Sequence, residues 1–202
     1  MKEQIVKKTA IAEKAVRELT QSGDLKRLAD PTALQIARFF ETKCLNRLQT
    51  AKLVYEASQD PKKHNLSNYS DYSEAVAAAY YAMYYVVHAY LASQYRVKLR
   101  EDVRGVHAIT HHLIVYYLVK TNKLAKHLYD EYVKTLQTTS AILTIEAFQE
   151  KAYTYAEKYS KTREARETFT YKTTATIEAY HAQHAITTAE EFINTIRQLM
   201  MK

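Results

Sequence analysis

Histidine is the residue type in this chain with the clearest capacity for chemistry, because an imidazole titrates near neutral pH. Three of the eight histidines lie close together in the sequence, at His107, His111 and His112. His107 and His111 are four residues apart, so on a helix they occupy one face. They could act as acid–base groups or as metal ligands, or they could be polar residues on a partly exposed first helical turn. A metal would need a third or fourth ligand.

A second candidate is the basic stretch that contains Arg163 and Arg166 and runs on to Tyr171. Arginine binds phosphate through two parallel hydrogen bonds and keeps its proton at working pH. The two arginines are three residues apart, so on a helix they project together. The alternative is a solvated surface turn in which the neighbouring glutamates pair with them.

A third candidate is the Glu-x-x-His motif formed by Glu178 and His181. Di-iron carboxylate bundles use this motif twice, together with two further glutamates. The chain has it once, so a di-metal bundle competes with coincidence. No Ser/His/Asp arrangement is recognisable, and Cys44 has the spacing of a buried small side chain.

The composition limits the fold that could position these residues. The 202 residues include two glycines, two prolines and one cysteine, far below the usual roughly 7% for glycine and 5% for proline. That composition disfavours all-β folds and excludes glycine-rich phosphate loops, disulfide frameworks and thiolate zinc clusters. No apolar run spans a membrane, and the N-terminus lacks a signal peptide, so we expect a cytoplasmic protein that needs no cofactor.

Charge and aromatic content point to an acidic partner. The formal net charge of +7 suits RNA, DNA or another polyanion, although a basic surface also simply solubilises a protein. The 18 tyrosines could stack on bases. Rings at helical spacing are more often part of the core.

Apolar periodicity predicts helices along most of the chain. Asp30-Pro31 should open the second helix, with Asp30 as its N-cap. Asp71 and Glu74 form a capping box for the third, and Thr187 and Glu190 form one for the last. Residues 58–68 should be a loop, and residues 98–105 a charged connection. The expected helices span 2–22, 30–57, 71–97, 106–120, 124–159 and 187–199.

These elements predict an all-α fold. We expect an up-and-down antiparallel helical bundle of about five helices plus an N-terminal helix. Residues 1–202 would form a single domain, with 1–29 as a helical arm and 30–202 as the bundle core. The secondary structure of residues 172–186 is ambiguous, because they are compatible with a helix but rich in threonine.

The alanine- and tyrosine-rich segment Tyr72–Leu91 resembles the HEPN domain family, and its core is Ala79-Tyr80-Tyr81-Ala82-Met83-Tyr84. His107 at the start of the following helix, Arg166 followed by Tyr171, and the closing Ala-Glu-Glu-Phe-Ile segment at 189–193 extend the resemblance over residues 34–200. The resemblance implies a prokaryotic bundle of about five helices that forms a homodimer. It also implies ribonuclease activity, since many members are ribonucleases, often toxins paired with a small nucleotidyltransferase antitoxin.

The resemblance also implies a chemistry. In this family a histidine assists attack by the ribose 2′-hydroxyl, an arginine stabilises the charged transition state, and no metal is needed. The family signature is Arg-x(4–6)-His. Arg166 has Tyr171 at the matching distance, and a phenol with a pKa near 10 is a poor base at neutral pH. Arg104 and His111 satisfy the spacing, but one helix earlier.

The leading hypothesis is therefore a HEPN-like protein that binds RNA or a nucleotide and cleaves RNA without metal. His107 or His111 would be the acid–base group, and Arg166 and Arg163 would bind phosphate. Arg104 would be a further phosphate or RNA contact, and Tyr171 would orient the phosphate or stack. The alternative is a non-catalytic module that dimerises through its alanine-rich helix or pairs with a nucleotidyltransferase.

Overall fold

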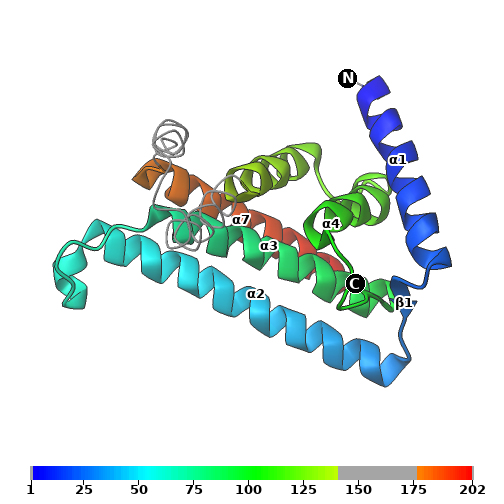
Figure 1. The fold of residues 1–202 in the computed structure, drawn as a ribbon, viewed down its shortest axis with the longest axis horizontal. Helices are drawn as coiled ribbons and strands as arrows, with labels where there is room; N and C mark the ends of the chain where they lie inside the picture. The colour runs from blue at the N-terminus through cyan, green and yellow to red at the C-terminus, as the bar shows by residue number, and fades with distance from the viewer. Residues whose placement is uncertain (1, 141–176, 202) are drawn as a thin grey trace, which may run out of the picture.

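The chain folds around its alanine-rich helix. The computed structural model describes residues 2–140 and 177–201, and within these ranges it is all-α apart from one pair of short strands (Figure 1). The predicted all-α fold class is confirmed. Helix α3 (Tyr72–Tyr95) lies between α2 (Asp30–Gln59) and α7 (Ala179–Met200) and packs along both.

Small side chains let these helices approach closely. Ala75, Ala78, Ala79, Ala82 and Ala89 of α3 have no exposed surface. Helix α2 runs antiparallel to α3, whereas α7 runs parallel to it (Figure 1). The side-chain amide of Gln94 donates to the backbone oxygen of Met200 over 3.3 Å, which joins the C-terminal ends of α3 and α7.

The helix starts agree only in part with the predicted caps. The Asp71 carboxylate accepts from the backbone N–H of Glu74 over 3.0 Å, so this N-cap is confirmed. Asp30 is not an N-cap: Ala29 occupies that position, and Asp30 pairs with Arg96 at 2.9 Å. The cap at Thr187 is wrong, because α7 already begins at Ala179.

The segments before α2, after α3 and between these two helices contain short elements that the sequence did not predict. Strand β1 (Leu25–Arg27) pairs antiparallel with β2 (Val97–Leu99), and Leu25 lies opposite Leu99. Both leucines are buried, so the strand pair closes one end of the core. The predicted loop at 58–68 contains a 3-10 turn, η1 (Pro61–His64).

The N-terminal helix covers a second layer. Helix α1 (Lys2–Gln21) buries Ala12 and Val16 and packs on α4 (Val106–Ile114) and on the π-helical turn η2 (Val115–Val119) that continues it. Together α4 and η2 match the predicted helix at 106–120. The next helix is described over 126–140, starting two residues later than predicted. The rest of that prediction lies outside the described residues.

Within the described ranges, no helix has both the length and the apolar character required to cross a bilayer.

The packing of α3 makes a stability prediction. Ala79→Leu adds three carbons where the side chain has no exposed surface, so we expect the free energy of unfolding to fall by about 1–3 kcal/mol. Ala108→Leu, at an exposed position of α4, is the matched control and should change it by less than about 0.5 kcal/mol. Urea unfolding followed by circular dichroism measures both. Equal stability of the two variants would contradict close packing around α3.

Candidate functional site

His107 lies against the tyrosines of α3. Its Nδ1 shares a hydrogen bond of 2.8 Å with the Tyr80 hydroxyl. The ring centres of Tyr80, Tyr81 and Tyr84 lie 5.6, 5.7 and 5.2 Å from the imidazole centre. Tyr84 is three residues from Tyr81 and four from Tyr80, spacings that share a helix face, so α3 presents the three rings around one imidazole. We call His107 and these three tyrosines the His107 cluster.

The surroundings of His107 favour its neutral form. Partial burial lowers the pKa of His107, because a charged imidazolium loses hydration there. No described residue hydrogen-bonds its Nε2. A neutral imidazole with one nitrogen fixed and the other unpaired can take or give a proton, which is what acid–base catalysis requires. Burial also raises the pKa of the Tyr80 hydroxyl, so this phenol stays protonated.

His88 lies deeper beside the cluster and serves packing. Its Nε2 is 3.0 Å from the Thr110 hydroxyl, which donates its own proton to the backbone oxygen of Val106 over 2.7 Å. The proton of the His88–Thr110 bond must therefore come from His88. Burial, together with nearby His107, lowers the pKa of His88 to about 4. This neutral imidazole joins α3 to α4.

His111 has a different partner from His107. Its Nε2 shares a hydrogen bond of 2.6 Å with the Tyr129 hydroxyl in the 126–140 helix. Burial lowers its pKa, helped by His112 and Lys8. The two histidines that share a face of α4 are thus held by tyrosines of two different helices, and nothing described brings them together on one ligand.

Most of the predicted phosphate-binding residues lie outside the part of the chain that the structure describes. Arg104 is exposed in the turn before α4, and among the described residues no hydrogen bond or ion pair joins it to the His107 cluster. Arg163, Arg166 and Tyr171 lie outside the described residues.

The Glu-x-x-His motif caps a helix. The backbone N–H of Glu178 donates to Nδ1 of His181 over 3.1 Å, completing a capping box at the start of α7. The described residues contain no group of three or more His, Cys, Asp or Glu placed to hold a metal ion. Capping therefore explains the spacing, and the described residues do not support a di-metal site there. Cys44 is buried, as its spacing predicted.

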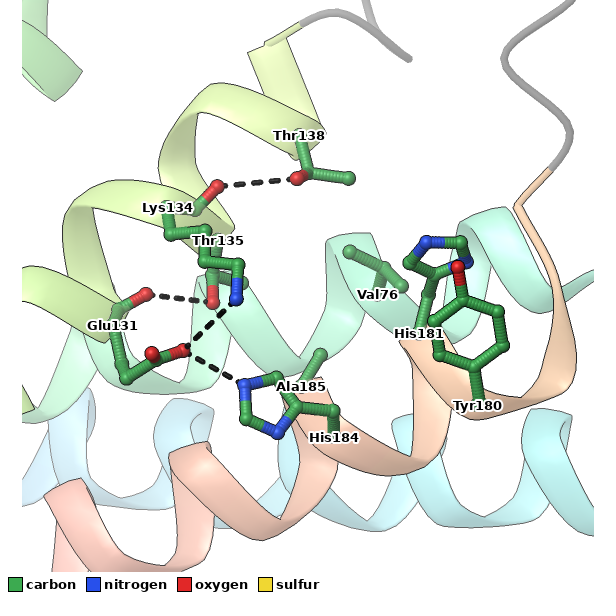
Figure 2. A pocket seen from close by; sticks show the side chains of 9 residues that line it. All are labelled: Val76, Glu131, Lys134, Thr135, Thr138, Tyr180, His181, His184 and Ala185. Carbon is green, nitrogen blue, oxygen red and sulfur yellow. Dashed lines mark hydrogen bonds and ion pairs between the residues drawn. The ribbon is translucent and has the colours of Figure 1, made fainter.

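A pocket that the sequence analysis missed opens between the 126–140 helix and α7 (Figure 2). It has a volume of about 220 Å³. Nε2 of His184 lies 2.8 Å from Oε2 of Glu131, and Nζ of Lys134 lies 3.9 Å from the same oxygen. The ring centres of Tyr180 and His181 are 3.8 Å apart. The pocket is lined by Val76, Glu131, Lys134, Thr135, Thr138, Tyr180, His181, His184 and Ala185.

The sequence contains a local signal for each half of this pocket. Glu131 and Lys134 are three residues apart, as are His181 and His184, so each pair shares a helix face. Because 53 residues separate Glu131 from His184, the sequence does not indicate that these two helix faces form one pocket.

Comparison with known protein families, with curated proteins and with solved structures yields no match for this chain.

The buried histidine predicts a pH dependence of stability. An unfolded histidine has a pKa near 6.5, whereas that of folded His88 is about 4. Between these values the unfolded chain binds a proton that the folded chain does not. The free energy of unfolding should therefore fall as the pH is lowered through this window. His88 accounts for a loss of up to about 3 kcal/mol.

Urea unfolding near pH 7 and near pH 4.5 measures this loss. His88→Gln should lose clearly less stability between the two pH values than the unmodified protein. His127→Gln, at an exposed histidine, should behave as the unmodified protein does. An unchanged pH dependence in His88→Gln would show that His88 is not held neutral.

Proposed function

We propose that this chain is a HEPN-like protein that associates with RNA or a nucleotide and cleaves RNA without a metal ion, with His107 as its acid–base group. The observation that carries the proposal is the His107 cluster. The tyrosines that enclose His107 belong to Ala79–Tyr84, the segment that resembles the HEPN family. The resemblance and the candidate histidine thus meet in one place.

Cleavage by an internal nucleophile needs few protein groups. A base removes the proton of the ribose 2′-hydroxyl, the oxygen attacks phosphorus, the bond to the 5′-oxygen breaks, and that oxygen receives a proton. Nε2 of neutral His107 can accept this proton in the tautomer whose Nδ1–H donates to the Tyr80 oxygen. Tyr80 would orient the ring through Nδ1 and act as a positioning residue.

The negative charge that develops on the phosphate calls for fixed cations. Arg166 and Arg163 remain our candidates for that role, with Arg104 as a further phosphate contact and Tyr171 as a stacking or orienting group. The net charge of +7 favours approach of a polyanion. Buried Cys44 is the single cysteine of the chain, so no disulfide can form within it. This agrees with a cytoplasmic location.

The catalytic proposal is tested by RNA cleavage in the presence of a metal chelator. His107→Gln should lower the cleavage rate by about 10²-fold or more, since general acid–base catalysis contributes that much. Tyr80→Phe removes the bond to Nδ1 and should lower the rate less. It should also shift the pH–rate profile, an effect that loss of packing alone would not produce. His127→Gln is the matched control and should retain full activity.

Arg166→Ala tests the phosphate-binding part in the same assay. We expect loss of cleavage, together with weaker RNA binding in a mobility-shift assay. Absence of cleavage in the folded, unmodified protein would overturn the nuclease proposal, and equal rates in His107→Gln and His127→Gln would remove His107 from it.

A second candidate function rests on the outer face of α2. Three large apolar side chains there are more than half exposed: Leu34 at 57%, Phe39 at 56% and Leu53 at 57%. Leu45 on the same helix is 36% exposed. Apolar residues gathered along one exposed helix face mark interaction surfaces. This face favours the alternative hypothesis, a non-catalytic interaction module.

The sequence of this face fits a second copy of the chain. Leu34 and Leu53 are equally far from the midpoint between Lys43 and Cys44, and Thr42 and Leu45 are as well. A twofold interface is self-complementary, so antiparallel pairing would place Leu34 of one copy opposite Leu53 of the other. The expected use of the alanine-rich helix for dimerisation does not fit, because α2 and α7 already cover α3 within the chain. A nucleotidyltransferase partner is the other occupant that the resemblance implies.

Charge-swap variants test this pairing by light scattering over a range of concentrations. Leu34→Lys and Leu53→Glu, each alone, should weaken the dimer at least about tenfold. The double variant should restore it, because each lysine then faces a glutamate of the other copy. Ile11→Lys, at an exposed position of α1, is the control. A monomeric unmodified protein at all concentrations would contradict the dimer.

A further inference from the structure

The pocket between the 126–140 helix and α7 is close to neutral in charge. Glu131 contributes one negative charge and Lys134 one positive charge, and His184 is held by the Glu131 carboxylate at 2.8 Å. A bare phosphate would meet the carboxylate as well as the ammonium group, so this pocket is poorly suited to an anion alone. It is better suited to an uncharged, hydrogen-bonding group.

One side of the pocket offers an aromatic surface. Tyr180 packs against His181 with ring centres 3.8 Å apart, yet the tyrosine remains 63% exposed. Val76 and Ala185 add apolar surface (Figure 2). Planar aromatic groups stack on such exposed rings, and base–aromatic stacking stabilises binding by about 1–3 kcal/mol.

The hydrogen-bonding groups of the lining can select a base by the donors and acceptors along its edge. The hydroxyls of Thr135 and Thr138 donate to backbone oxygens of their own helix, and Nδ1 of His181 accepts from the backbone of Glu178. We assign recognition mainly to the Glu131 carboxylate, which can only accept hydrogen bonds. Its Oε2 already accepts from Nε2 of His184, and the further lone pairs of its two oxygens can accept from a ligand. Among the four RNA bases, guanine alone presents two adjacent N–H donors, N1–H and the exocyclic amine, which match the two oxygens of a carboxylate.

We propose that this pocket binds a guanine base, which stacks on Tyr180 and donates to Glu131. The ammonium group of Lys134 at the pocket rim is then available to the attached phosphate. The proposal extends the proposed association with RNA or a nucleotide to a second site, which does not include the His107 cluster. The base could belong to a free guanine nucleotide or to single-stranded RNA.

Isothermal titration calorimetry with GMP, AMP, CMP and UMP tests the base preference. GMP should bind at least about tenfold more tightly than AMP. Glu131→Gln should abolish that preference, because its amide presents a donor to the guanine edge. Tyr180→Ala should weaken binding of every nucleotide, whereas Tyr180→Phe should retain it. Glu191→Gln, an exposed carboxylate of α7 outside the pocket lining, is the control.

Three outcomes would overturn the proposal: no binding of GMP at millimolar concentration, equal affinity for GMP and AMP, or unchanged GMP affinity in a folded Glu131→Gln variant. A guanine-containing RNA oligomer compared with its adenine counterpart distinguishes the sources, since tighter binding of the oligomer than of GMP assigns the pocket to RNA. Cleavage of a guanine-free RNA reports separately on His107. Failure of the guanine-binding proposal can therefore be distinguished from failure of the catalytic proposal.

Discussion

The burial of α3 is the constraint on which the described structure depends. Fifteen of its 24 residues are buried, so it must be covered on several sides. Alanines permit this, because they let α2 and α7 approach α3 without large side chains between the backbones. The strand pair of β1 and β2 and the ion pair between Arg96 and Asp30 fix the chain where α2 begins and α3 ends.

A buried helix rich in tyrosine also has hydroxyls that need partners, since an unpaired buried polar group is costly. Tyr80 finds His107 in α4, and Tyr90 lies 3.2 Å from Nζ of Lys123. His88 and Thr110 add a second polar link between α3 and α4. The same requirement that holds these helices together therefore produces a neutral, oriented imidazole at His107, which is the starting point for acid–base chemistry.

Some basic residues pair with carboxylates within the fold, and because each pair uses one charge of either sign, the net charge of +7 is unchanged. Lys52 pairs with Glu190, Lys120 with Glu13, and Arg197 with Glu41, and each pair joins two helical elements. Neither the His107 cluster nor the pocket at Glu131 is strongly cationic. The net charge can draw a polyanion to the surface, but selectivity at these places has to come from hydrogen-bond geometry and stacking, because long-range attraction does not distinguish one base from another.

The sequence by itself determined the fold class, the approximate extents of α1 to α4, the Asp71 cap and the burial of Cys44, because periodicity and capping act over a few neighbouring residues. It placed His107 and His111 on one face of a helix but could not show that each is held by a tyrosine of a different helix. It placed the start of α7 at Thr187 rather than Ala179, because Thr187 and Glu190 have the spacing of a capping box and the threonine-rich residues before them left the local pattern ambiguous. Only the tertiary structure paired Leu25 with Leu99 and Glu131 with His184. These contacts join residues dozens of positions apart, and their partners are decided by how the helices pack around α3.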